Sequence, residues 1–287
     1  MFAAHEAKFY YVTEEPYGVT PTNPAFKGLD ENVQNIDPSV NPGNIPVRGC
    51  GSRDLAQLKK GLLQVGFKLD YIVPADDVMQ CLQHIITLYP QTCEVIYEKP
   101  GTSLIDLRFS GCRFDKETVR CSVEDVVHAS IEAVGQNVNP DTAKLEGASY
   151  TDFGGAVPFS SCYVQRGDAD GSNLQTIEEV TDWEWTITNN LKRVPVIRST
   201  NGSLVKYLLP RSRNLTGKLT FEFENRTRYY EAVTDAEFSL KFGIGPKYVL
   251  FTHCKWDNIE TPTKFDDLVS LNAQFTACAV EFEDVTP

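Results

Sequence analysis

One sequence motif occurs twice, as GCRFDKETVRCSVEDVV at residues 111–127 and as HCKWDNIETPTKFDDLV at residues 253–269. The two copies align without a gap, with four identical positions and five conservative ones. Upstream of each copy, LLQVGFKLDY and NLTGKLTFEF occupy the same place in the order of elements. A repeat of this length is typical of duplicated domains. We therefore expect two similar tandem domains, residues 1–145 and residues 146–287.

The repeated motif is either an acidic metal site or a structural corner. Neither copy has the dense, alternating oxygen ligands of a calcium loop, so we expect no metal and no cofactor. A carboxylate that follows an aromatic residue at a strand end can accept backbone N–H bonds and hold a turn. We predict the same strand-turn-strand corner in both domains. The repeated turn positions are Cys112, Asp115, Asp125, Cys254, Asp257 and Asp267.

Most of the chain alternates apolar and polar residues between Gly, Pro, Asn and Asp, the pattern of half-buried antiparallel strands. Helical spacing is confined to residues 74–90 and, more weakly, to residues 226–237. The Pro-rich residues 13–46 read as a long loop, and residues 136–158 as a linker or exposed arm. The fold class is mainly β, with a flanking helix in each domain. Strands are predicted at residues 65–73, 103–111, 182–188, 217–225, 237–245 and 270–282.

Charge and hydropathy restrict the function. The net charge is −12 and the acids are spread along the chain, which argues against tight binding to nucleic acid phosphates. There is no long apolar run and no signal-peptide pattern at the start of the sequence, so we expect a soluble protein made in the cytoplasm, with no membrane partner.

The eight cysteines allow a second interpretation. Together with the sequons at Asn201, Asn214 and Asn225 they are compatible with a secreted, disulfide-linked protein. Without a signal peptide or a CxxC pair, buried free thiols are the better expectation.

Catalytic signatures are missing from the sequence. The four histidines are scattered, and no GxSxG, Walker or dinucleotide motif occurs. RGDADGSN at residues 166–173 lacks the bidentate Glu of a calcium loop and reads as an exposed hairpin tip. We expect no enzyme, and no catalytic residue is assigned.

Two strands predict how a sheet is oriented. In DWEWTIT, Trp183, Trp185 and Ile187 point one way, while Asp182 and Glu184 point the other. The segment 217–225 behaves in the same manner. Both predict a sheet with one apolar face and one acidic face.

These patterns resemble the tail tube proteins of long-tailed, siphovirus-like phages and related prokaryotic viruses. The resemblance rests on NIPVRGCGSRDLAQLKKGLLQVGFKLDYIVPADD (residues 44–77), on WEWTITNNLKRVPVI, on RNLTGKLTFEFEN and on HCKWDNIETPTKFDDLVSLNAQFTA. It implies a β-sandwich whose copies close into a ring with a β-barrel lumen. Stacked rings then form the virion tail tube that conducts DNA during ejection.

The resemblance also implies partners. Six tube domains per ring would need three duplicated chains with pseudo-sixfold symmetry, and a hexamer is the alternative. Other tail proteins are further partners, and DNA passes through transiently without specific binding. The acids implied to face the lumen are Asp182, Glu184, Glu222 and Glu224.

Two other interpretations stay open at this point. One is a secreted or virion carbohydrate-binding β-sandwich module. The other is a tail terminator or the tube protein of a contractile system.

Overall fold

Alternating apolar residues build the strands, as β6 (Gln64–Ile72) illustrates. The computed structural model of the chain describes residues 2–51, 53–99, 101, 104–223, 227–262 and 269–283. Along β6, Val65, Phe67, Leu69 and Tyr71 are buried and the residues between them are more exposed. One face of the strand thus enters the core. The expectation of a mainly β protein is confirmed.

Among the residues that the structure describes, the first half of the chain has eleven strands, β1 to β11, and two short α-helices. A 3-10 turn precedes β1 and another precedes β3. The elements are β1 (Ala7–Thr13), β2 (Ala25–Gly28), β3 (Val33–Asn41), β4 (Ile45–Val47), β5 (Gln57–Lys59), β6, α1 (Met79–Leu82), α2 (His84–Thr87), β7 (Gln91–Tyr97), β8 (Ile105–Ser122), β9 (His128–Gly135), β10 (Asn137–Asp141) and β11 (Ser149–Asp152).

The second half follows a 3-10 turn at Phe159–Ser161. It repeats much of the order of the first half, with one α-helix between the sixth and seventh of its strands. The elements are β12 (Cys162–Gly167), β13 (Gln175–Thr176), β14 (Val180–Thr188), β15 (Lys192–Val194), β16 (Tyr207–Leu209), β17 (Asn214–Glu222), α3 (Thr227–Val233), β18 (Phe238–Ile244), β19 (Lys247–Glu260), β20 (Ser270–Thr276) and β21 (Ala279–Phe282).

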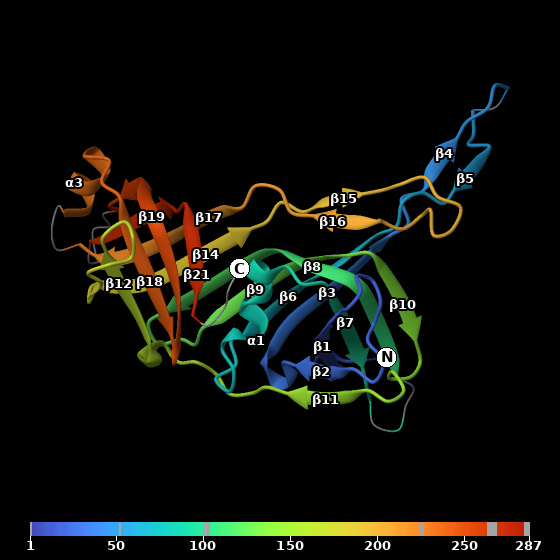
Figure 1. Cartoon of the computed structure of the whole chain (residues 1–287), viewed down its shortest axis with the longest axis horizontal. Helices are drawn as coiled ribbons and strands as arrows, with labels where there is room; N and C mark the ends of the chain where they lie inside the picture. The colour runs from blue at the N-terminus through green and yellow to red at the C-terminus, as the bar shows by residue number, and fades with distance from the viewer. Residues whose placement is uncertain are drawn as a thin grey trace.

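Strand pairing follows the same order in both halves. In the first half β3, β6, β9 and β8 are successive neighbours, and in the second half β14, β17, β20 and β19 are. Antiparallel pairing of β8 with β14 joins the two sets into one sheet of eight strands, which we call the long sheet. Figure 1 shows this junction near the centre of the molecule.

Each half also has an outer sheet that shares its longest strand with the long sheet. In the first half the order is β11, β2, β1, β7, β8 and β10, and in the second it is β13, β12, β18, β19 and β21. Only the β2–β11 pair is parallel among the strands described. Because β8 and β19 belong to two sheets each, they fix the packing of the layers in both halves.

The core lies between these sheets. Trp183, Trp185 and Ile187 of β14 are buried, as their spacing predicted. The ring of Trp185 lies 5.8 Å from that of Phe251, and aromatic pairs at such distances add to the gain from burial. Phe223 is a correction, since it follows the end of β17 and is 41% exposed, although the alternation of residues 217–225 placed it on the apolar face.

The predicted helix at residues 74–90 is only partly present. It consists of α1 and α2, separated at Gln83, and ends where Leu88 adopts a left-handed conformation with φ 52°. No side chain caps either start, so the packing of buried residues such as Leu82 and Ile85, rather than capping, holds both turns. No helix in the described part of the chain is long and apolar enough to cross a membrane.

The presumed loops contain regular structure. Residues 13–46 include β2 and β3, and residues 136–158 include β10 and β11. Pro38 lies within β3, opposite Phe67 of β6. A proline cannot donate to a ladder, but β3 is the outermost strand of the long sheet, where this is tolerated. Pro38 therefore marked an edge strand instead of a loop, whereas Pro16, Pro21 and Pro24 lie between β1 and β2, outside any strand.

Two β-hairpins project from the sandwich body (Figure 1). We call β4–β5, residues 45–59, the first arm and β15–β16, residues 192–209, the second arm. The second arm runs over the first half of the chain, whereas the first arm projects away from the body.

Candidate functional site

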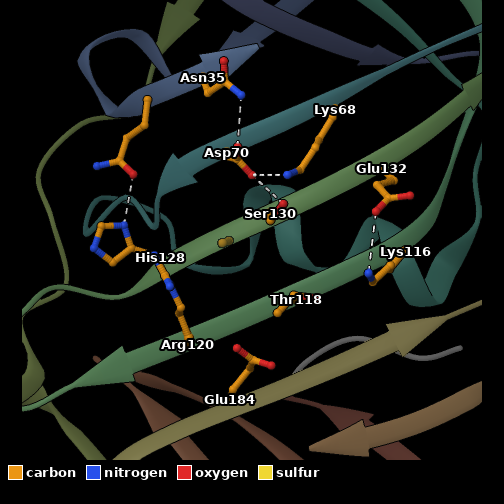
Figure 2. A pocket seen from close by; sticks show the side chains of 12 residues that line it. Asn35, Lys68, Asp70, Lys116, Thr118, Arg120, His128, Ser130, Glu132 and Glu184 are labelled. Carbon is orange, nitrogen blue, oxygen red and sulfur yellow. Dashed lines mark hydrogen bonds and ion pairs between the residues drawn. The ribbon is translucent and has the colours of Figure 1, made fainter. Parts of the chain in front are cut away.

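One face of the long sheet is polar from β3 to β19. Figure 2 shows its first part, a shallow groove of about 480 Å³ lined from β3, β6, β9, β8 and β14. Side chains alternate along each strand, so the polar face is the reverse of the face that contains Trp183 and Trp185. We call this surface the polar face.

Charges on the polar face are arranged in rows across the strands. Asp37 of β3 lies opposite Lys68 of β6, and Lys68 lies opposite Glu132 of β9. Glu132 in turn lies opposite Lys116 of β8, with 3.6 Å between Lys116 Nζ and Glu132 Oε1. Opposite charges on neighbouring strands attract, so each cation in this row is compensated by a carboxylate.

A second row continues into the other half of the chain. Arg120 of β8 lies opposite Glu184 of β14, and Glu184 lies opposite Lys218 of β17. The described acids of the polar face outnumber its cations. The acids are Asp37, Asp70, Glu132, Asp182, Glu184, Glu222 and Glu260, and the cations are Lys68, Arg113, Lys116, Arg120, Lys218 and Lys255.

Hydroxyl and amide groups lie between the charged rows. Ser130 Oγ donates to Asp70 Oδ1 at 2.5 Å, and the Thr118 and Thr186 hydroxyls are 2.9 Å apart across the β8–β14 junction. Burial raises the pKa of Asp70, but hydrogen bonds from Ser130 and Asn35 and the charge of Lys68 outweigh it, so that pKa lies below its usual value. Asp70 is therefore a carboxylate at neutral pH.

The predicted lumen-facing acids lie on this polar face where the structure describes them. Asp182 accepts a hydrogen bond from Ser122 Oγ, and Glu184 and Glu222 are exposed. Glu224 lies outside the described residues. The polar face also carries cations, because β6, β8 and β17 direct lysines and an arginine to the same side as these acids.

Four of the repeated residues, Cys112, Asp115, Cys254 and Asp257, lie in strands and not in the turns that we expected for them. Cys112 and Cys254 are fully buried in β8 and β19. Asp115 lies at a β-bulge between Phe114 and Lys116, and Asp257 lies at one between Trp256 and Asn258. A bulge adds a residue without ending the strand, so the same polar residue that suggested a turn sits within a continuous β8.

The main chain and carboxylate of Asp115 hold the exit of β14. The Asp115 carbonyl accepts from Asn189 N at 2.7 Å, and its Oδ1 accepts from Leu191 N at 2.6 Å. Asp257 Oδ2 instead accepts from Thr276 Oγ1 at 2.6 Å. Asp115 thus fixes where the second arm begins, a role that the spacing of acids did not reveal.

Asp125 lies in the turn between β8 and β9. A backbone hydrogen bond from Val126 and one from the His128 ring lower the pKa of Asp125. His128 Nδ1 also lies 3.1 Å from Oε1 of Gln34, a residue of β3. Asp267, the other repeated position, lies outside the described residues.

Two buried ionisable groups away from the polar face differ in their partners: Arg108 forms ion pairs, whereas Glu117 has no hydrogen-bond partner among the residues described. Arg108 bonds to Glu94 and Asp106 at 2.6 Å each inside the first outer sheet. Glu117 is fully buried, and both of its carboxyl oxygens lack a hydrogen-bond partner among the residues described. Within those residues no group of three or more His, Cys, Asp or Glu side chains could hold a metal ion, and all eight cysteines are free.

A family comparison identifies the chain. The family described as phage tail tube protein matches residues 91–277, well over half of the chain. The chain belongs to this family. It is therefore a structural protein of a virion tail, and the tail tube resemblance read from the sequence is confirmed.

Two solved structures similar to this tail tube protein come from gene transfer agent particles. A chain from the virion of a native gene transfer agent particle is 12% identical, with a TM-score of 0.36 over 43% of this chain and 95% of that chain. A chain from the tail of an empty gene transfer agent particle, refined with C6 helical symmetry, is 13% identical, with a TM-score of 0.37 over 43% and 96%. Among curated proteins the search found no match.

Proposed function

We propose that the polar face lines the lumen of a tail tube that conducts DNA during ejection. The observation that carries this proposal is the placing of carboxylates beside the cations of both rows, Asp37 and Glu132 beside the two lysines of the first row and Glu184 between the two cations of the second, with acids in excess. A protein gains affinity for DNA when its free lysines and arginines bind the phosphates and release their counterions. A wall whose cations lie beside carboxylates gives little such gain, and its excess negative charge repels the duplex. The role is structural and non-enzymatic.

We further propose that residues 1–145 and 146–287 are two tube domains in tandem. The strand order of the two halves and the matching bulges at Asp115 and Asp257 support this. Cys112 lies opposite Gln91 of β7, and Cys254 lies opposite Phe238 of β18, at the same place before a register shift. Three such chains would make a ring of six domains, and a hexamer is the alternative.

The β8–β14 junction suggests how the ring closes. Lys116 lies opposite Thr188 in that junction. Their counterparts by strand register are Asn258 on β19 and Asn41 on β3, and both strands are at the ends of the long sheet. We propose that β19 of one copy pairs with β3 of the next, which would continue the sheet around the ring and protect both edges.

Electron microscopy and cross-linking together test this function. Purified protein should form rings of three chains each, or tubes in which such rings are stacked. A variant with Asn41→Cys and Asn258→Cys should form disulfides between copies, because opposed residues on paired strands have the Cβ spacing that a disulfide needs. Either single variant is the matched control. A stable monomer that hydrolyses a glycan would overturn the proposal.

A further inference from the structure

The second arm is held on the first half of its own chain. Arg113 Nη1 donates to Leu208 O at 2.7 Å, and Gln136 Nε2 donates to Val205 O at 2.8 Å. Leu63 N also donates to the carbonyl of Ser203 at 2.7 Å. Two apolar side chains of this arm are covered in the process, since Leu208 is 1% exposed and Val205 is fully buried, whereas Ile197, Tyr207 and Leu209 stay exposed. The contact therefore combines polar anchors with buried apolar surface.

The first arm has the same place in its own half. β3 ends at Asn41 and β4 begins at Ile45, with the spacing that separates Thr188 of β14 from Lys192 of β15. Leu58 pairs with Pro46 in the first arm as Leu208 pairs with Arg193 in the second.

Burial differs between the two arms. Leu58 is 62% exposed and Leu55 is 42% exposed, and Ile45 and Val47 are exposed as well. The first arm thus has leucines at the positions where the second arm has the buried Val205 and Leu208, but the first half of the same chain does not cover these leucines. A hairpin of two three-residue strands gains little stability without such cover.

We propose that the first arm of one copy binds the second half of the next copy, as the second arm binds the first half within one chain. This rests on the proposed ring. The receiving residues follow from register: Lys255 lies opposite Thr276 as Arg113 lies opposite Val134. Cys278 lies two residues after Thr276, as Gln136 lies two residues after Val134.

The receiving surface is accessible in the single chain. The Lys255 side chain is 42% exposed and Cys278 is exposed. Lys255 Nζ already bonds to Asp235 at 2.8 Å, and an ammonium group has three donors, so it can also donate to a carbonyl of the arriving arm. The occupant is a second copy of this chain, with Leu58 as its buried anchor.

Cross-linking to a native cysteine tests the contact directly. In a Cys50→Ser background, Leu58→Cys in assembled rings should react through a short bismaleimide with Cys278 of a neighbouring copy, as read by peptide mass spectrometry. Adding Cys278→Ser should remove the product, and Val19→Cys, at a position 51% exposed in the same half, should not form it. Rings without the product, or a product found only in stacked rings, would overturn the arm assignment.

Paired aspartate variants separate this contact from the folding of the chain. Leu58→Asp should leave the melting temperature of the single chain unchanged and weaken ring assembly by about tenfold or more, because a buried leucine anchor is lost. Leu208→Asp should lower the melting temperature of the single chain, since its site is already buried. Leu58→Asp rings as stable as wild-type rings would contradict the arm contact alone. Absence of wild-type rings would contradict the proposed function itself.

Discussion

At the residue scale, the most unusual group is the carboxyl of Glu117. Burial raises the pKa of Glu117 well above 4.5, so it is protonated in the folded chain. It lies opposite Ile131 of β9 and Ile187 of β14. At the same place of the other half, β19 has Ile259 opposite Ala273. A polar acid therefore occupies a position that accepts an aliphatic side chain.

We predict that Glu117→Gln stabilises the chain at neutral pH. The unfolded chain loses this proton above about pH 4.5 while the folded chain keeps it, so the wild-type free energy of unfolding falls as pH rises through that range. Glutamine does not titrate, and the gain at pH 8 should be on the order of 2 kcal/mol, shrinking towards pH 4. Urea unfolding of the single chain across pH measures it, with exposed Glu132→Gln as control. Identical pH profiles of wild type and Glu117→Gln would refute the assignment.

Residue patterns predicted the faces of strands only up to the first bulge. Alternation counted from Phe114 places Lys116 inside and Glu117 outside. The bulge at Asp115 adds a residue and reverses this, so that Glu117 and Val119 are buried. The sequence shows the repeated aspartate, but the hydrogen bonds that make it a bulge come from Asn189 and Leu191, far along the chain.

At the element scale, Asn189 joins three elements where β14 ends. It is 1% exposed, its Nδ2 donates to Ile85 O of α2 at 2.7 Å and to Phe114 O of β8 at 3.2 Å, and its Oδ1 accepts from Arg213. One amide thus satisfies carbonyls of a helix and a strand beside the entry to the second arm.

We predict that Asn189→Ala destabilises the chain by about 2–4 kcal/mol, because two buried carbonyls and a guanidinium lose their partner. Thermal and urea unfolding measure the loss. Asn139→Ala, on the exposed part of β10, is the matched control and should change the free energy of unfolding by less than about 0.5 kcal/mol. Equal effects of the two variants would show that Asn189 does not hold the junction.

Elements were predicted where local pattern decided them and missed where tertiary contacts did. The bounds of β14 and β17 lie within three residues of their predicted ranges. In β14, the alternation of Trp183, Trp185 and Ile187 defines the apolar face without contacts from other strands. The helix at residues 74–90 breaks into α1 and α2 because its residues pack into the core individually, with the His84 ring 5.3 Å from Tyr11 and 5.8 Å from Phe114. Such contacts with distant strands leave no trace in local spacing.

At the scale of the whole molecule, the polar face depends on sequence segments far apart in the chain. Asp37, Lys68, Glu132 and Lys116 form one row although they belong to four different strands. The acids of β14 and β17 were predictable from alternation, but the compensation of cations was not, because it needs the register of β6, β9 and β8. The charge pattern is therefore a property of the assembled sheet.

Reversing the charge of Glu132 and Glu184, the central acids of the two charged rows, tests the role of charge compensation. Glu132→Lys would place three cations side by side with Lys68 and Lys116, and Glu184→Lys would do so with Arg120 and Lys218. Clustered cations release counterions when phosphates bind, so rings of this double variant should retain linear duplex DNA at low salt and release it steeply as salt rises. Wild-type rings should retain none.

The topology of the DNA shows on which side of the ring the new cations lie. A covalently closed circle cannot thread a closed ring, so rings of the double variant should hold linear DNA and not the circle. Glu146→Lys with Glu281→Lys makes the same change in net charge at exposed sites outside the polar face and should bind both forms alike. Equal binding of circles and linear DNA by the Glu132 and Glu184 double variant would place the polar face on the outside of the ring. In that case the compensated rows would serve solubility rather than the passage of DNA.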